Sequence, residues 1–273
     1  MRDVIFIVGM GRSGTSALTR VLGLCGAAMP LETLPANFAN PLGYWEPRRT
    51  VDLNDRFLGA YGRSWYDETL ELQVRPPGGE AADSLIAEAA GLLSEAFEPS
   101  GPIALKDPRI AGILPYWTAA AERAGMRPTV VHNFRRPEDV AASLERRDGM
   151  TSCSSNTLWL KYNLFPERDS RELPRAFVSY EDLMRDWESV VARCAAQIGV
   201  PLTVTPQAKA AVGGFLSPAL RHHASDWRPH AVEPRDLLGR TYALLNEARG
   251  GRVDTAGFDD VRAAYVAHSQ AQA

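Results

Sequence analysis

The sequence predicts an α/β fold, in which a parallel sheet is flanked by helices on both faces. Short continuous apolar runs, typical of strands covered on both sides, recur along the chain. Each run is followed by a turn and a segment of helical periodicity, which is the strand–turn–helix repeat of a parallel sheet. The 273 residues, 45% of them hydrophobic and 23% charged, suffice for one sizeable core. We therefore expect one domain over residues 1–273, with its core at about 3–200 and a helical C-terminal segment at about 201–273.

The first predicted unit is a strand at Val4–Val8, a glycine-rich turn at Gly9–Gly14 and a helix at Thr15–Cys25. Apolar residues spaced three and four apart indicate the helix. Gly26 follows its last turn, where glycine is favoured because it adopts the left-handed conformation without a Cβ penalty.

Three further strands are predicted at Pro102–Leu105, Pro128–Phe134 and Ala176–Ser179. Residues 137–148 are expected to be helical, because they open with a proline and two acidic residues and close with basic residues before a glycine. Residues 183–198 carry one apolar stripe, which is typical of a helix packed on the core.

Four stretches lack a clean apolar period, namely 27–50, 68–80, 149–171 and 214–236. Long irregular segments in a compact domain are commonly lids or substrate loops. We expect these loop and helical insertions on the side of the site where an acceptor substrate binds.

Composition excludes several classes of protein. The net charge of −3 does not favour a general nucleic-acid or anionic-membrane binder. Three widely spaced cysteines form no disulfide framework or metal pair, and the five histidines form no metal-ligand motif. The N-terminal apolar run is too short for a secretory signal or for a membrane span of ~20 residues. A cytoplasmic protein without a metal, a nucleic-acid partner or stable membrane insertion is expected; the oligomeric state is unknown at this stage.

The stretch IFIVGMGRSGTS, from Ile5 to Ser16, predicts an anion site of the P-loop type. Its strand, glycine-rich turn and helix N-terminus direct backbone N–H groups and the helix dipole at one point, where Ser13 and its neighbours add hydroxyl donors. The alternative is a tight turn with capping hydroxyls. The match to G-x-x-x-x-G-K-[ST] is incomplete, because Thr15 stands where the lysine belongs and Arg12 lies three residues earlier.

The absence of the lysine helps to distinguish a nucleoside triphosphate from a sulfuryl compound as the donor substrate. In ATP and GTP enzymes that lysine contacts the β- and γ-phosphates, and the next hydroxyl holds Mg²⁺. A sulfuryl group carries less charge than a terminal phosphate, so one guanidinium near the bridging oxygen would stabilise the leaving phosphate without a metal. Arg12 is suited to that role.

The loop RSGTS, Arg12 to Ser16, resembles the 5′-phosphosulfate loop of the sulfotransferases that use 3′-phosphoadenosine-5′-phosphosulfate (PAPS). The segment RRPEDVAAS is similar to that family's 3′-phosphate motif, with Arg135 at the end of a strand and Ser143 eight residues later. The resemblance implies that Arg12 contacts the bridging oxygen, that Arg135 and Ser143 hold the 3′-phosphate, and that the 5′-phosphate is held by Ser13, Gly14, Thr15 and Ser16.

Further segments support the resemblance, which covers roughly residues 3–200 in separated blocks. SYEDL is similar to a family motif whose tyrosine lies near the adenine, which implies that role for Tyr180. RHHASDW is loosely similar to a late element and implies a 3′-phosphate role for Arg221. NPLGYWEP, residues 40–47, looks like a segment of bacterial sulfotransferases near the acceptor. The tryptophan that often follows the family's loop is replaced by Ala17.

The group that accepts the acceptor's proton is an open question. Many family members use a histidine after the central strand, where LKDPR aligns Pro108 instead. A base must lie within hydrogen-bonding reach of the hydroxyl, and we rank Glu46 first and Asp107 second. The alternative for Glu46 is a surface ion pair with a neighbouring arginine, and for Asp107 a bridge or cap with Arg109. His132, inside an apolar strand, is expected in the core, and His222 and His223 are candidates for the base only if the segment 214–236 folds over the site.

These features predict transfer of a sulfuryl group from PAPS to a hydroxyl of a small-molecule, lipid-linked or carbohydrate acceptor, with PAP as product. Aromatic residues in irregular stretches, namely Trp45, Trp65, Trp159 and Tyr162, are candidates for the acceptor pocket or for the core. Two other functions are weighed: a Mg-ATP-dependent small-molecule kinase, and a non-catalytic module that binds PAP.

Overall fold

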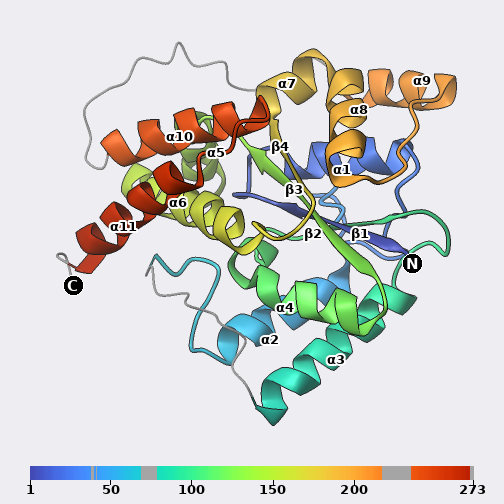
Figure 1. Ribbon diagram of the computed structural model, residues 1–273, viewed down its shortest axis with the longest axis horizontal. Helices are drawn as coiled ribbons and strands as arrows, with labels where there is room; N and C mark the ends of the chain where they lie inside the picture. The colour runs from blue at the N-terminus through green and yellow to red at the C-terminus, as the bar shows by residue number, and fades with distance from the viewer. Residues whose placement is uncertain (38–39, 41, 69–78, 217–234, 271–273) are drawn as a thin grey trace.

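The computed structural model describes residues 1–37, 40, 42–68, 79–216 and 235–270 (Figure 1). Its sheet has four parallel strands in the order β2-β1-β3-β4. The strands are β1 (Asp3–Val8), β2 (Ile103–Lys106), β3 (Arg127–Phe134) and β4 (Arg175–Ser179). All four predicted strands are present within one residue at each end, so the predicted fold class is confirmed.

The helices follow the strands and fill the connections between them. They are α1 (Thr15–Leu24), α2 (Arg48–Gly59), α3 (Glu80–Glu95), α4 (Ile110–Arg123), α5 (Pro137–Asp148), α6 (Ser152–Asp169), α7 (Tyr180–Arg185), α8 (Trp187–Ile198), α9 (Pro206–Phe215), α10 (Arg235–Arg249) and α11 (Thr255–Gln270). Among the residues that the structure describes, no helix is long and apolar enough to cross a membrane.

The central strand β1 shows how the two faces of the sheet are covered. Successive side chains of a strand point to opposite faces. Accordingly, Val4 and Phe6 pack with α2, α3, α4 and α6, whereas Ile5 and Ile7 pack with α1, α8 and α9. All four are fully buried. Helices therefore lie on both faces, as the continuous apolar runs predict.

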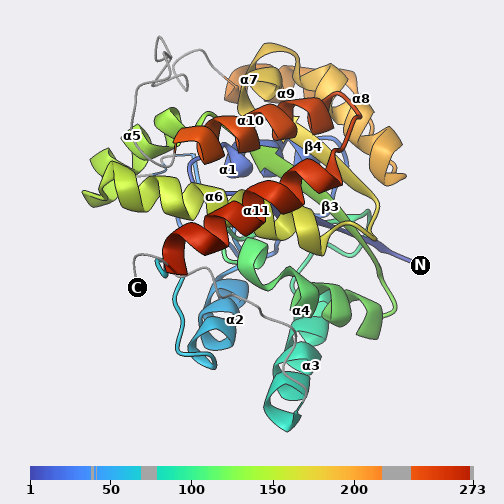
Figure 2. The same cartoon turned by 60° about the vertical axis from the view of Figure 1, so that its left-hand side comes forward.

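The prediction that residues 149–171 are irregular is wrong. Helix α6 occupies most of this stretch, and every side chain from Leu158 to Glu167 is buried. A helix enclosed on all sides has no solvent-facing stripe, so its sequence lacks the amphipathic period by which helices are recognised. Figure 2 shows α10 and α11 lying against α6, which accounts for its burial on the outer side.

The other irregular stretches have mixed outcomes. Residues 27–47 contain no helix or strand where they are described, and α2 starts at Arg48. Most of 68–80 and of 214–236 lies outside the described residues.

The apolar stripe at 183–198 belongs to two helices, α7 and α8, because the chain turns at Asp186. The Asp186 side chain accepts a hydrogen bond from the Ser189 amide, and α8 begins there.

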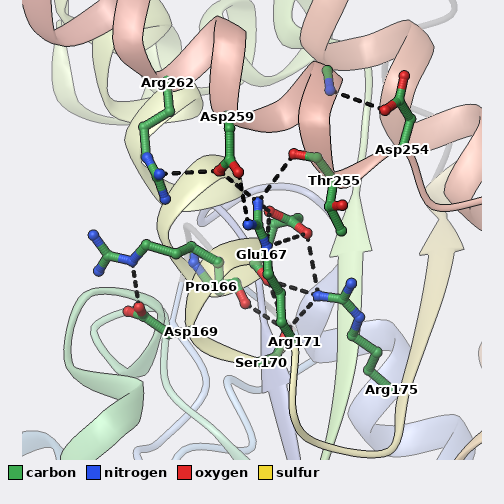
Figure 3. A network of polar contacts seen from close by, with 12 residues as sticks. Pro166, Glu167, Asp169, Ser170, Arg171, Arg175, Asp254, Thr255, Asp259 and Arg262 are labelled. Carbon is green, nitrogen blue, oxygen red and sulfur yellow. Dashed lines mark hydrogen bonds and ion pairs between the residues drawn. The ribbon is translucent and has the colours of Figure 1, made fainter.

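A polar network holds the last helix, α11, against the core (Figure 3). The Glu167 carboxylate, 1% exposed, accepts from Arg171 at 2.8 Å and from Arg175 at 3.3 Å. Arg171 also pairs with Asp259 of α11 at 2.8 Å. Arg175 is the first residue of β4, so this network lies at the edge of the sheet where the strands begin.

Candidate functional site

The predicted site residues gather where the strands end. The register pairs Ile7 with Lys106, Val8 with His132 and Phe134 with Ser179. The glycine-rich loop, the end of β2, Arg135 and Tyr180 therefore leave the sheet at one edge. Ligands of open α/β sheets bind at this carboxyl edge.

Two glycines allow the loop to approach its neighbours closely. Gly9 has a φ of 133°, and a Cβ there would lie 2.0 Å from the carbonyl oxygen of Asn133 on β3. Gly14, immediately before α1, has a φ of 87°, and a Cβ would lie 2.3 Å from the Tyr180 ring. Since side chains at either position would collide with a neighbour, the loop is pressed against β3 and against Tyr180.

The loop also holds two polar groups in unusual settings. Ser13 is fully buried, and its hydroxyl makes no hydrogen bond to any described residue. Its backbone carbonyl accepts from the Asn133 side chain at 2.7 Å. Arg12 adopts a φ of 72°, which costs a residue other than glycine about 1 kcal/mol or more. An orphaned buried hydroxyl beside a glycine cradle fits a bound anion.

Arg12 brings the two predicted phosphate motifs into direct contact. Its Nε donates to the Ser143 hydroxyl on α5 at 2.9 Å, between residues 131 positions apart. Partial burial lowers the pKa of Arg12, and the nearby charges of Arg147 and Arg135 lower that pKa further. The cations thus oppose one another, and a bound anion would relieve this repulsion.

Arg135 and Tyr180 complete this group of residues. The Arg135 guanidinium lies 4.4 Å from the centre of the Tyr180 ring, in a cation–π geometry, and its Nε lies 3.4 Å from an Asp139 oxygen. The Tyr180 ring also covers Gly14, so it stands between the loop and Arg135. The structure therefore brings together Arg12, Gly14, Arg135, Ser143 and Tyr180. The predicted Arg221 lies outside the described residues.

A second cluster joins the other side of the loop. Lys106, at the end of β2, donates from Nζ to Glu46, to the Ser16 hydroxyl at 3.2 Å and to the Tyr44 carbonyl at 3.4 Å. Asn40 donates to the same hydroxyl at 3.4 Å. The side chains of Lys106 and Glu46 are only 3% and 6% exposed.

Glu46 is thereby placed next to the phosphate-type loop. Burial raises the pKa of Glu46, and the ammonium of Lys106 acts in the opposite direction. The alternative of a surface ion pair with Arg48 or Arg49 is wrong, because Glu46 is buried and Arg49 lies 3.7 Å from Glu95.

Asp107 has a different environment. It is fully buried, and one oxygen accepts from Asn54 of α2 at 2.9 Å. The other oxygen accepts from the backbone and the side chain of Arg109, at 2.9 and 3.1 Å. The contacts with Arg109 are the bridge and cap that the sequence offered as the alternative to a catalytic role, and together with Asn54 they occupy both carboxylate oxygens.

Three further candidate residues, His132, Trp159 and Trp45, have well-defined contacts in the structure. His132 is buried in β3, where burial lowers its pKa to about 4 and Nε2 lies 3.0 Å from the Asn163 side-chain oxygen. Trp159 is fully buried and donates to the Arg135 carbonyl at 3.0 Å. Trp45 has a φ of 58° and lies under the Arg20 guanidinium, 4.6 Å from its ring centre. His132 and Trp159 are therefore core residues.

The pairing of Lys106 with Glu46 and the contacts of Asn40 and Tyr44 were not predicted from the sequence. Asn40 and Tyr44 lie in the segment NPLGYWEP, and Lys106 lies in LKDPR, so both resemblances pointed at the right stretches. Glu46 and Lys106 are 60 residues apart, however, and nothing in their local patterns predicts that they form a pair.

Comparison with solved structures is informative about the fold. No family model and no curated protein matches the sequence. The chain is similar to the sulfotransferase domain of the Synechococcus PCC 7002 olefin synthase, with a TM-score of 0.53 and 19% identity over 89% of this chain and 96% of that one. It is also similar to the sulfotransferase domain of the curacin biosynthetic pathway, with a TM-score of 0.50 and 17% identity over 90% and 98%. The chain thus has the fold of sulfotransferase domains.

Proposed function

We propose that this protein transfers a sulfuryl group from PAPS to a hydroxyl of a small-molecule, lipid-linked or carbohydrate acceptor, giving PAP and a sulfate ester. The observation that carries the proposal is the hydrogen bond from Arg12 to Ser143. It joins the loop suited to a 5′-phosphosulfate and the helix suited to a 3′-phosphate at one edge of the sheet. A nucleotide phosphorylated at both ends matches such a pair of sites.

The residues present fit this donor. The 5′-phosphate would be held at the N-terminus of α1 by the loop N–H groups with Ser13, Gly14, Thr15 and Ser16, and the buried Ser13 hydroxyl would gain a partner there. Arg135 and Ser143 would hold the 3′-phosphate. Tyr180, next to Arg135, is the candidate contact for the adenine.

The chain's own groups then have distinct tasks. PAPS, when bound, supplies a sulfuryl group attached to a phosphate leaving group. Glu46 accepts the proton of the acceptor hydroxyl as the oxygen forms its bond to sulfur. Arg12 stabilises the negative charge left on the phosphate oxygen when the old sulfur–oxygen bond breaks. Lys106 opposes the effect of burial on the pKa of Glu46 and so favours the ionised form that takes up the proton.

Glu46 is favoured over Asp107 as the base because of what each carboxylate already contacts. Glu46 shares the Lys106 ammonium with Ser16 of the loop, whereas both oxygens of Asp107 are engaged by Asn54 and Arg109. A carboxylate whose oxygens are both held would lose hydrogen bonds on protonation. Asp107 is accordingly assigned to positioning the end of β2.

Donor recognition is tested by thermal unfolding with PAP, ADP or ATP, each with EDTA and with Mg²⁺. A ligand at 100 times its Kd adds ~2.7 kcal/mol to the stability of the protein that binds it. We expect PAP to stabilise the protein in EDTA and ADP to have little effect. Stabilisation by ATP only with Mg²⁺, and none by PAP, would replace this proposal with a kinase.

Two variants sharpen the result. Arg135→Ala should abolish most of the shift produced by PAP, and Arg146→Ala, an exposed arginine later on α5, serves as its matched control. Equal shifts in both variants would show that the 3′-phosphate is not read by Arg135. Binding of PAP with no turnover of PAPS against any hydroxyl would instead indicate a non-catalytic PAP-binding module.

A further inference from the structure

Two adjacent aromatic residues after α2 form an exposed platform. The ring centres of Trp65 and Tyr66 lie 3.6 Å apart with an angle of 32° between the planes. Tyr66 is 52% exposed, which is rare for a large apolar side chain in the described part of this chain. Trp65 is half-buried and packs on the core cluster at its inner side.

Buried side chains of α6 fix this aromatic platform in place. The Tyr162 hydroxyl donates to the Trp65 carbonyl at 3.0 Å, and the Lys161 ammonium donates to the Asp67 carbonyl. Both side chains belong to residues at most 4% exposed. Burial lowers the pKa of Lys161 to about 8. Removing an ammonium from water is costly. The hydrogen bond from the buried Lys161 to the Asp67 carbonyl therefore indicates that the backbone of this loop is held in a defined position.

The aromatic platform adjoins the proposed transfer site. The Arg147 guanidinium lies 6.0 Å from the Trp65 ring centre. Arg147 is one helical turn beyond Ser143 on α5, and Ser143 contacts Arg12. The charge of Arg147 is also felt by Arg12, whose pKa it lowers. Figure 1 shows the segment after α2 on the same side of the molecule as α5 and α6.

Charged side chains flank the two aromatic residues in the sequence, and Arg147 lies near the Trp65 ring in space. Arg63 pairs with Asp67 at 3.0 Å, and Arg147 pairs with Asp148 at 2.6 Å. An alkyl chain laid on the rings would remove these ion pairs from water and offer them nothing in return. A sugar ring has an apolar C–H face that packs on an aromatic ring and hydroxyls that bond to carboxylates and guanidinium groups.

We propose that Trp65 and Tyr66 form a subsite for a sugar ring of the acceptor. This inference rests on the proposed function and narrows its acceptor to a carbohydrate or a molecule that bears one. The exposed side of the Tyr66 ring contacts the face of the sugar ring, Trp65 supports the Tyr66 ring from beneath, and Arg63, Asp67 and Arg147 contact the sugar hydroxyls. Lys161 and Tyr162 act as positioning residues, because they hold the backbone of the segment that carries the rings.

Saturation-transfer NMR on the intact protein tests the subsite without requiring turnover. The probes are methyl glycosides of glucose, galactose, mannose and N-acetylglucosamine, with maltose and cellobiose, against phenol and 1-octanol. We expect transfer to the ring protons of at least one sugar. Tyr66→Ala should reduce that transfer at least fivefold, and Tyr66→Phe should preserve it. Leu31→Ala, at a position 63% exposed on another part of the surface, is the control.

The outcomes separate this inference from the proposed function. No transfer to any sugar, transfer to phenol or octanol alone, or equal transfer to wild type and Tyr66→Ala would overturn the sugar subsite. The stabilisation by PAP, measured on the same samples, should be equal in all variants, and its absence from the wild type would overturn the donor site instead. Tyr162→Phe, which removes only the bond to the Trp65 carbonyl, should weaken sugar transfer while leaving the PAP shift unchanged.

Discussion

Lys106 and Glu46 are both buried, so each ionised side chain depends on the other to balance its charge. Such a pair contributes little net stability, because the desolvation of two ions offsets their attraction. Its position beside Ser16 places next to the glycine-rich loop a carboxylate whose pKa burial raises and Lys106 lowers. The local sequence shows a glutamate in one irregular segment and a lysine after a strand. Their pairing depends on how 60 intervening residues fold, and no periodicity carries that information.

Glu46→Gln should lower kcat for sulfuryl transfer by about 10²–10⁴, the range for loss of a general base, and leave the Kd of PAP unchanged. The amide still accepts a hydrogen bond from Lys106, which limits the loss of stability. Single-turnover rates with saturating PAPS measure the effect, and Glu95→Gln, in an exposed ion pair, is the control. Full activity in Glu46→Gln together with inactive Asp107→Asn would reverse the assignment of the base.

His132 predicts a particular dependence of stability on pH. Burial lowers its pKa from 6.5 to about 4, so below pH 6.5 the unfolded chain takes up a proton that the folded chain does not. The stabilising effect of the neutral histidine is complete above pH 6.5 and is lost as the pH falls toward 4, by roughly 2–3 kcal/mol at pH 4.5. Urea unfolding at pH 7 and pH 4.5 should show this loss in the wild type. His132→Gln should lose less, and an identical loss in the variant would exclude His132 as the cause.

The elements were predictable to very different degrees. The four strands follow from their apolar runs, because a strand covered on both faces is apolar at every position. Helix α5 follows from its proline and its charge pattern. Helix α6 does not follow from the sequence in the same way, because it is buried on all sides and therefore has no alternation of apolar and polar residues at helical spacing. The glycine-rich turn was predicted from the sequence. The close approach of Gly9 to Asn133 and of Gly14 to Tyr180 was not, because it is set by packing between elements that are distant in the sequence.

The loop before α1 gives a test at the level of the element. Gly14→Ala combines the strain of a positive φ with a collision against the Tyr180 ring, so it should destabilise the protein by about 1–3 kcal/mol and weaken PAP binding at least tenfold. Gly26→Ala shares a positive φ but meets no atom within 4 Å, and it therefore measures strain alone. Equal effects on PAP affinity in the two variants would contradict the close packing of the loop on Tyr180.

At the scale of the whole molecule, the candidate site and the buried ion-pair network lie at opposite edges of the sheet. The candidate site lies where the strands end, and the network around Glu167 lies where β4 begins (Figure 3). That network links α6, β4 and α11, so it holds the last helix, α11, against the core. The described part of the segment after residue 200 contains α9, α10 and α11. The network itself was unpredictable, because it depends on pairs such as Arg171 and Asp259, which lie 88 residues apart in the sequence.

Glu167→Ala should therefore destabilise the protein by about 3–5 kcal/mol, because it leaves Arg171 and Arg175 without their buried partner. The affinity for PAP, measured by calorimetry at a temperature where the variant is folded, should stay within twofold of the wild type. Glu247→Gln, in an exposed pair with Arg252, should leave both properties unchanged. A large loss of PAP affinity in Glu167→Ala would show that the two edges are coupled.

The hydrogen bond between Arg12 and Ser143 has a consequence for how this protein acquires its function during synthesis. The two residues are 131 positions apart, and β3 must pair with β1 before α5 can bring Ser143 to the loop. Such a high sequence separation makes this a late event in folding, since the ends of a long chain must meet first. A nascent chain that has emerged only as far as β2 contains the glycine-rich loop but not yet Ser143, the residue to which Arg12 donates its hydrogen bond. Retention on immobilised PAP would thus select chains whose sheet is fully assembled and leave partly folded ones in the flow-through.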